Sequence, residues 1–292
     1  MKKTAWVGFA AVLCVSSVVH AEGTHLAAPN GQLGAGIVFS PEQRGRAHAE
    51  LGFFHATEGS AHLNSFVWLV GLAYKVTPHV ELEALLPIGI LESGGSSSEV
   101  ALGTGNLHFG VSYLHGERGF RMKLGAAVEY GPWTQDYELE STLAVALGHA
   151  LGGGQDFGLW IPELLSVVVP GRFEFGDTVV ASADLALGAH ISTGNADLFA
   201  NGTDVEISFQ VAPGVGVYVS DRALLGLRAP VALIPTNVDN DGTLLALEPY
   251  FRYDLAAGFL NARFSMNLDE PYGFSFDEGR FWGLHVGGGA TF

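Results

Sequence analysis

The chain has 292 residues, with 14 basic and 30 acidic side chains and a formal net charge of −16. This acidic balance argues against nucleic acid or an anionic surface as a binding partner. Hydrophobic residues make up 48% of the chain and charged residues only 15%. Beyond residue 21, however, no uncharged apolar run reaches the roughly 18 residues that a membrane-spanning helix needs, which excludes a bundle of transmembrane helices.

The first 21 residues, MKKTAWVGFAAVLCVSSVVHA, predict a secretory signal peptide that is cleaved after Ala21. Lys2 and Lys3 form its charged start, residues 6–19 its apolar middle, and residues 19–21 a small-residue cleavage site. A transmembrane helix is the alternative, but the apolar run is short for one. Cleavage would leave 12 basic and 30 acidic residues, a net charge of −18, and no cysteine, because Cys14 lies within the signal.

The exported chain divides into two parts. Residues 22–45 are rich in glycine and proline, and the sequence leaves open whether they form a periplasmic tail, a plug or additional strand material. In residues 46–292, apolar residues alternate with polar or small ones, which is the period of β-strands. For example, Met122 and Leu124 share one face of a strand, and Arg121 and Lys123 share the other.

This alternation predicts an all-β chain of about 12 strands. Residues 132–162 would then form one long outer loop, in which YELESTLAVALGHAL could be a short helix; a hairpin there would raise the count, so that 10–14 strands are compatible with the sequence. The predicted strands are 46–56, 64–76, 79–90, 100–114, 119–131, 163–176, 178–191, 205–219, 222–234, 244–254, 258–268 and 280–292.

Three features favour a transmembrane, antiparallel, up-and-down β-barrel over a soluble β-sandwich. The strands are long enough to cross a bilayer with a tilt. Short breaks such as Thr77-Pro78 alternate with long polar ones such as residues 192–204, as periplasmic turns alternate with outer loops. Aromatic residues on the apolar face gather near both strand ends, where a membrane has its two interfaces. Those near the short turns or the terminus are Tyr74, Tyr113, Phe120, Phe175, Tyr253 and Phe292.

The signal, the alternating strands and the terminal Phe292 resemble those of Gram-negative outer-membrane β-barrels. In that class the last strand, ending in an aromatic residue, is the signal read by the barrel-assembly machinery. The resemblance implies that Trp282, Leu284, Val286 and Phe292 form this assembly signal and face the lipid. It also implies localisation in the cell outer membrane, with membrane lipid and the assembly machinery as partners.

Two hairpin segments carry a second, more local resemblance. VGLAYKVTPHVELEALLP (70–87) and GTGNLHFGVSYL (103–114) are similar to hairpins of transporter barrel families, including the MetA-type phenol-degradation family. This implies a porin-like channel or transporter for a small solute. The solute itself is not indicated, and no cofactor is expected.

The polar faces of the strands should line the barrel interior. Their charges are balanced in sign, so they indicate either a salt-bridged wall that holds a narrow barrel together or a polar pore without an ion preference. The alternative to a channel is therefore a structural or surface-interaction barrel with a plugged lumen. The predicted lumen-lining charges are Lys75, Glu81, Glu83, Arg121, Lys123, Glu129, Arg172, Glu174, Asp184, Glu206, Arg228, Glu248, Arg252 and Arg263.

HISTGN, residues 190–195, suggests a third function. His190, Ser192 and Asp184 share one strand face, and the stretch looks like the His-x-Ser pair of outer-membrane phospholipases and lipid A deacylases. A histidine base beside a serine hydroxyl suits acyl transfer. However, Asn195 is displaced from the position expected in those enzymes, and the pair points inward, away from lipid. No catalytic residue is therefore predicted as the main interpretation, and the dispersed histidines predict no metal site.

Overall fold

The computed structural model describes nine parts of the chain. The segments predicted as signal peptide and outer-loop helix lie outside them, and of the predicted N-terminal tail or plug only residues 44 and 45 are described. In the described ranges, no helix has the length and apolar character needed to cross a membrane. The described residues are 44–58, 61–94, 99–117, 119–131, 159, 164–193, 205–233, 243–268 and 281–292.

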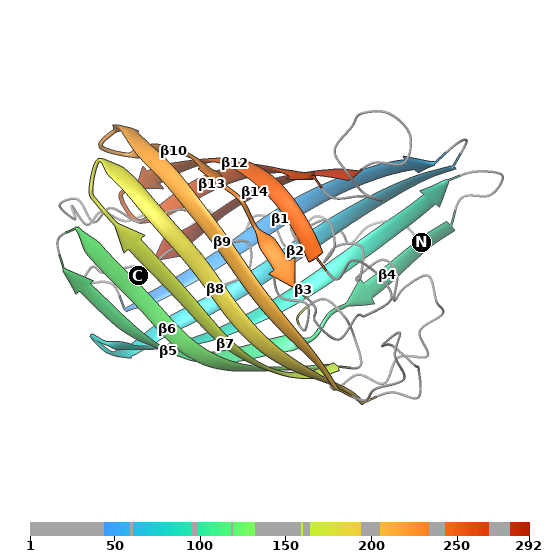
Figure 1. The fold of residues 1–292 in the computed structure, drawn as a ribbon, viewed down its shortest axis with the longest axis horizontal. Coiled ribbons are helices and arrows are strands. Elements are labelled where there is room, and N and C mark those ends of the chain that lie inside the picture. The colour runs from blue at the N-terminus through green and yellow to red at the C-terminus, as the bar shows by residue number, and fades with distance from the viewer. Residues whose placement is uncertain are drawn as a thin grey trace.

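These residues form fourteen strand segments (Figure 1). Their bounds lie close to those predicted from the alternation of apolar residues. They are β1 (Gly45–Glu58), β2 (Ala61–Thr77), β3 (Val80–Gly94), β4 (Glu99–Thr104), β5 (Leu107–Glu117), β6 (Phe120–Tyr130), β7 (Leu164–Phe175), β8 (Val179–Ser192), β9 (Val205–Ser220), β10 (Ala223–Arg228), β11 (Val231–Leu233), β12 (Thr243–Leu255), β13 (Gly258–Asn267) and β14 (Phe281–Thr291).

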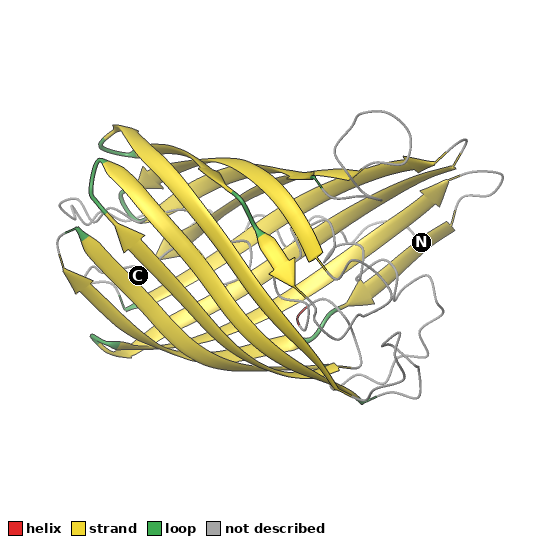
Figure 2. Cartoon of the chain, viewed as in Figure 1, coloured by secondary structure: helices red, strands yellow, loops and turns green. Residues whose placement is uncertain are grey.

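The segments build a closed antiparallel barrel of twelve strands, which confirms the predicted fold and count. Two strands are each interrupted once: β4 and β5 both pair with β3, and β10 and β11 both pair with β9 and β12. Each remaining strand pairs with its neighbours in the chain, and β14 pairs with β1 to close the ring. The strands tilt across the barrel, and the pairing of β14 with β1 closes the sheet on itself (Figure 2).

Proline accounts for the interruption between β10 and β11. Pro230 has no N–H, so it cannot donate to the ladder, and the strand breaks at residues 229–230. The break between β4 and β5 lies opposite another proline, Pro87 of β3, whose carbonyl accepts a hydrogen bond from the Gly105 N–H at 3.1 Å. The two breaks therefore interrupt the ladders locally without opening the ring.

The short turns lie together at one end of the barrel, at the left of Figure 1. At the turn between β7 and β8, Gly176 has a φ of 96°, a left-handed conformation that favours glycine. A Cβ at this position would also lie 2.0 Å from the Val179 carbonyl oxygen. Glycine is therefore required there by both conformation and space.

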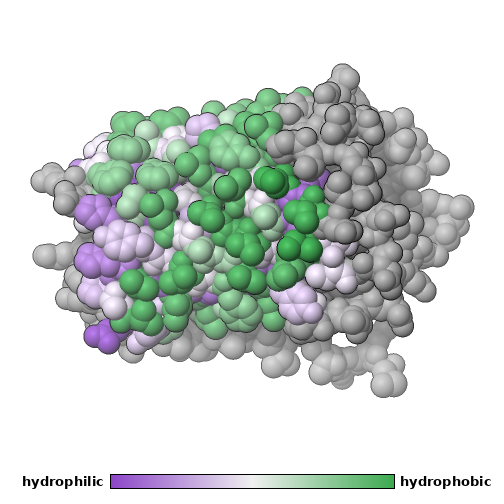
Figure 3. Space-filling model, turned by 60° about the horizontal axis from the view of Figure 1, so that its bottom comes forward, coloured by the Kyte–Doolittle hydropathy of each residue, from purple (hydrophilic) through white to green (hydrophobic). Residues whose placement is uncertain are grey.

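The outer wall of the barrel is apolar. Large hydrophobic side chains on alternate positions are exposed around the ring, among them Leu72 at 58%, Val169 at 52% and Leu187 at 51%. The visible face carries a band of hydrophobic residues, with hydrophilic ones near the end that holds the short turns (Figure 3). A soluble protein rarely exposes an apolar surface of this extent, whereas a bilayer would cover it.

The predicted aromatic positions lie on this outer wall near the short turns. Tyr74, Tyr113 and Phe175 are exposed, and the rings of Phe120 and Phe175 pack with centroids 5.1 Å apart. Aromatic rings on the outer wall near the strand ends are typical of a membrane–water interface.

Candidate functional site in the barrel interior

All fourteen charged residues predicted to line the lumen lie on the inner face of the wall. Thirteen of them are at most 9% exposed, and the side chain of Arg121 is 12% exposed. The inner position follows from the period of two: each lies between outward apolar neighbours on its strand. Buried charges need partners, so their contacts determine what the interior can do.

Four of these contacts form a closed quartet across β1, β3 and β6. The Nη2 of Arg46 lies 2.8 Å from the Oε1 of Glu81 and 3.8 Å from the Oε2 of Glu83. From the other side, the Nζ of Lys123 lies 3.1 Å from Glu81 Oε1 and 2.7 Å from Glu83 Oε2. The quartet therefore alternates cation and carboxylate at every step.

A longer chain of pairs begins on β6 and runs over β7 and β8 to β10. Arg121 Nε lies 3.1 Å from Glu174 Oε2, and the other oxygen of Glu174 accepts from Arg172. Arg172 Nη1 then lies 3.1 Å from Asp184 Oδ1, and Arg228 Nη1 lies 3.2 Å from Asp184 Oδ2. Asp184 thus bridges two guanidinium groups.

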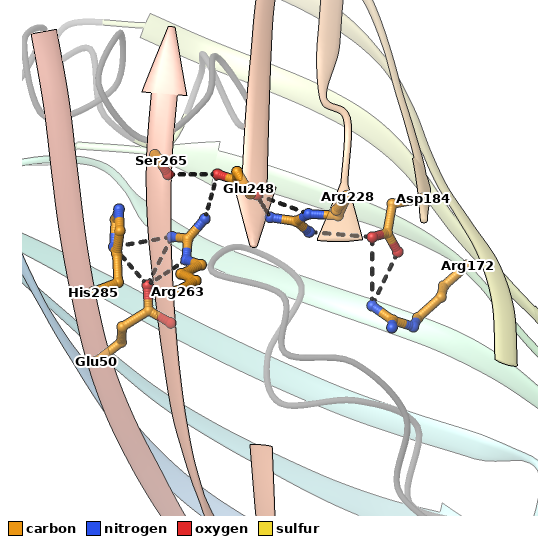
Figure 4. Close-up of polar contacts among 8 residues, drawn as sticks. All are labelled: Glu50, Arg172, Asp184, Arg228, Glu248, Arg263, Ser265 and His285. Atoms are coloured by element: carbon orange, nitrogen blue, oxygen red, sulfur yellow. Dashed lines mark hydrogen bonds and ion pairs between the residues drawn. The ribbon is translucent and has the colours of Figure 1, made fainter. Parts of the chain in front are cut away.

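The same chain continues over β12 and β13 to β1 (Figure 4). Arg228 donates to Glu248, with Nε at 2.8 Å from Oε2. Glu248 Oε1 accepts from Arg263 Nη1 at 3.0 Å and from Ser265 Oγ at 2.7 Å. Arg263 Nη2 ends the chain at Glu50 Oε1, 2.7 Å away.

The quartet and this eight-residue chain both connect β1 with β6, one around each side of the barrel. Together their twelve residues run around the inner wall, and we call them the paired belt; on β6 its two parts meet at two neighbouring cations, Lys123 and Arg121. It contains six cations and six carboxylates, so its formal charges cancel. Its members are Arg46, Glu50, Glu81, Glu83, Arg121, Lys123, Arg172, Glu174, Asp184, Arg228, Glu248 and Arg263.

Several belt pairs reach past an intervening strand. Neighbouring strands lie about 4.8 Å apart, so these contacts span about 10 Å and need long side chains from at least one partner. Arg46 on β1 reaches β3 over β2, and Lys123 on β6 reaches β3 over β5. Arg228 on β10 reaches β8 over β9, and Arg263 on β13 reaches β1 over β14.

The strands that are crossed present small residues at these points. Ala73 lies between Arg46 and Glu83 in the ladders, and Gly110 lies beside Glu83. Gly214 faces Arg228, and Gly287 faces Glu50. A Cβ on Gly110 would lie 3.0 Å from the Glu83 Cγ, so a larger residue there would displace the carboxylate.

Two predicted charges, Lys75 and Glu206, are not members of the belt. Lys75 is opposite Glu81 in the β2–β3 ladder, and Glu206 is opposite His190 in the β8–β9 ladder. The remaining two, Glu129 and Arg252, have contacts of their own. Glu129 lies 3.0 Å from His108, and Arg252 lies 2.7 Å from Asp254 and 4.5 Å over the Phe259 ring.

The sequence interpretation missed four members of this interior. Arg46 and Glu50 were not assigned because no face was predicted for the first strand, although the run RAHAEL alternates polar and apolar residues. His108 and His285 were interpreted as dispersed histidines. They lie instead beside acidic side chains, with His285 Nδ1 2.9 Å from Glu50 Oε1.

The structure does not bring the suggested catalytic residues together. The ring nitrogens of His190 lie 2.8 Å from Ser166 Oγ and 2.7 Å from Ser208 Oγ, on the two neighbouring strands. Asp184 stands six residues earlier on the same strand, about 20 Å away at the rise of a β-strand, and binds arginines. Asp184 is therefore too far from His190 to be the acid of the suggested catalytic set.

The predicted assembly residues lie on the outer wall at β14 and the terminus. Leu284, Val286 and Phe292 are exposed, and Trp282 packs beside Phe53 and Phe264 with ring centroids 5.7 Å and 5.8 Å apart. Among the residues that the structure describes, no group of three or more His, Cys, Asp or Glu side chains is arranged to hold a metal ion.

A closed barrel with an apolar outer wall and a charged, polar inner wall defines a β-barrel of the outer-membrane type. Comparison with solved structures agrees at the level of the fold. An outer-membrane channel from Pseudomonas putida F1 has 14% sequence identity and a TM-score of 0.56, covering 87% of this chain and 98% of that one.

Other solved barrels are more distant. The translocator domain of the autotransporter NalP from Neisseria meningitidis has 14% identity and a TM-score of 0.46, covering 85% of this chain and 88% of that one. The NanC porin has 5% identity and a TM-score of 0.46, covering 84% and 99%. No protein-family model matches the chain, and no curated protein sequence matches it.

Proposed function

We propose that the protein is an outer-membrane channel for small solutes. The observation that carries this proposal is the division between an apolar outer wall and an inner wall of charged and polar side chains, which suits a polar pathway through lipid. The barrel of similar fold from Pseudomonas putida is itself described as an outer-membrane channel, which supports the proposal.

The paired belt favours a second candidate, a structural or surface-interaction barrel with a closed interior. Every belt carboxylate is at most 7% exposed, and a belt of satisfied ion pairs could serve only to hold the wall together. The two candidates differ in whether a solute passes.

Single-channel recording separates the two candidates. Protein refolded into a planar bilayer should produce discrete current steps if a pathway crosses the barrel, because ions follow water through it. The same preparation, heat-unfolded before addition, should produce none. Persistent absence of current from verified folded barrel would contradict the channel and favour the closed structural barrel.

We also propose that the chain is inserted into the outer membrane by the barrel-assembly machinery, with β14 and Phe292 as the recognised element. Phe292 exchanges backbone hydrogen bonds with the first strand: its carbonyl accepts from Arg44 and Gly45 at 2.8 Å, and its N–H donates to Gly45 at 2.9 Å. The terminal residue therefore stands at the seam that closes the barrel.

Deleting Phe292 should reduce the amount of folded barrel in the outer membrane while export continues. The deletion removes the terminal aromatic ring and these seam contacts together. The measurement is the heat-modifiable gel shift of the membrane fraction, with the cleaved but unassembled chain followed in the periplasm. Phe292→Tyr keeps the ring and backbone and should assemble normally. Normal assembly of the deletion variant would contradict the proposal.

A further inference from the structure

We infer that the channel takes uncharged polar solutes and shows little preference between cations and anions, because the paired belt neutralises its own charges around the whole wall. This inference rests on the proposed channel function and adds the class of solute to it. The carrying observation is the equal number of cations and carboxylates in each part of the belt.

Each of the two parts of the belt is balanced separately. The quartet holds two cations and two carboxylates, and the eight-residue chain holds four of each. Channels that select ions by side-chain charge use rings of one sign. Here each part of the belt is neutral as a whole, so the wall offers neither cation nor anion a favourable net potential.

A charged solute at the belt would have to break existing pairs. It loses hydration as it enters the barrel and then needs a group of opposite charge. Asp184, for example, is already bound to two arginines, and Arg263 to two carboxylates. If a solute drew Asp184 or Arg263 away from these partners, a buried charge would be left unpaired, which costs free energy.

An uncharged solute can bind while the pairs stay intact. It needs no partner of opposite charge, so no pair of the belt has to open as it passes.

The solute class is tested by swelling of proteoliposomes in three six-carbon solutes of similar size: neutral glucose, the gluconate anion and the glucosamine cation. We expect glucose to enter several-fold faster than either charged solute. Entry of gluconate or glucosamine at the rate of glucose would overturn the inference while leaving the channel intact. Failure of all three to enter would instead contradict the channel function itself.

The role of the belt is tested by the reversal potential in a KCl gradient. The wild type should reverse close to zero. Asp184→Asn leaves one uncompensated positive charge and should raise the anion-to-cation permeability ratio by about tenfold, because a unit charge about 6 Å away in water favours the anion and disfavours the cation by about threefold each. Arg228→Gln, at the other end of the same pair, should shift the ratio by a similar factor towards cations.

Asp221→Asn is the matched control, because it removes the same charge from an exposed turn residue. It should leave the reversal potential unchanged. A strong sign preference in the wild type, or belt variants that reverse at the wild-type potential, would overturn the inference. If one belt variant fails to show the heat-modifiable folded form, the other still tests the sign of the shift.

Discussion

Replacing Glu248 with leucine should lower the free energy of unfolding by about 3–5 kcal/mol, the usual cost of removing one partner from a buried ion pair. Glu248 is fully buried and accepts hydrogen bonds from Arg228, Arg263 and Ser265. The substitution leaves two guanidinium groups facing an apolar side chain. The measurement is the urea midpoint and slope for the barrel in detergent micelles or bilayers.

Two companion variants separate the loss of charge from the loss of packing. Glu248→Gln keeps an oxygen that can accept from Arg228 and should destabilise less than leucine. Asp221→Leu, at an exposed turn, should change the free energy of unfolding by no more than about 0.5 kcal/mol. An unfolding midpoint for Glu248→Leu equal to that of the wild type would show that the belt does not stabilise the barrel.

Replacing Leu187 with arginine should lower the stability of the inserted barrel by about 2–4 kcal/mol, because the residue faces outward near the middle of β8. Leu187 is 51% exposed and pairs with Val169 and Phe209, which are also exposed. In a bilayer, a guanidinium at this depth meets hydrocarbon instead of water. The measurement is unfolding from lipid vesicles, compared with unfolding of the wild type.

Position within the membrane is the variable that this substitution tests. Thr178→Arg places the same side chain in the exposed turn between β7 and β8 and should be nearly neutral. Leu187→Phe keeps the surface apolar and should also be tolerated. A Leu187→Arg barrel as stable as the Thr178→Arg barrel would argue that lipid does not cover this face.

The strands and their faces could be predicted because both are local properties. A period of two assigns each side chain to the inner or outer face from its own strand alone. Arg172 and Glu174, for example, alternate with Val169, Phe173 and Phe175 within a few residues, and the structure places the two sets on opposite faces. No face was predicted for the first strand, although its alternation is as regular.

The contacts between the charges could not be predicted. Which residues meet depends on the register of every ladder and on which strand closes the ring, and neither is encoded in local periodicity. Arg263 and Glu50 are 213 positions apart and meet only because β14 pairs with β1. The same limit explains the interpretation of His190 and Ser192: sharing a face suggested a catalytic set, whereas the registers place Ser166 and Ser208 beside the histidine.

The sequence by itself determined that this chain forms long alternating strands, about twelve in number with 10–14 compatible, and which of their residues face inward and outward. Strand period and turn positions are local properties, since each depends only on a short stretch of residues. Only the tertiary structure decided that the inward charges form a charge-balanced belt that crosses strands at small residues such as Gly110 and Gly287. That arrangement depends on closure and register. Two charges about 10 Å apart meet only if strand pairing places them on either side of one intervening strand, and if that strand presents a small residue between them.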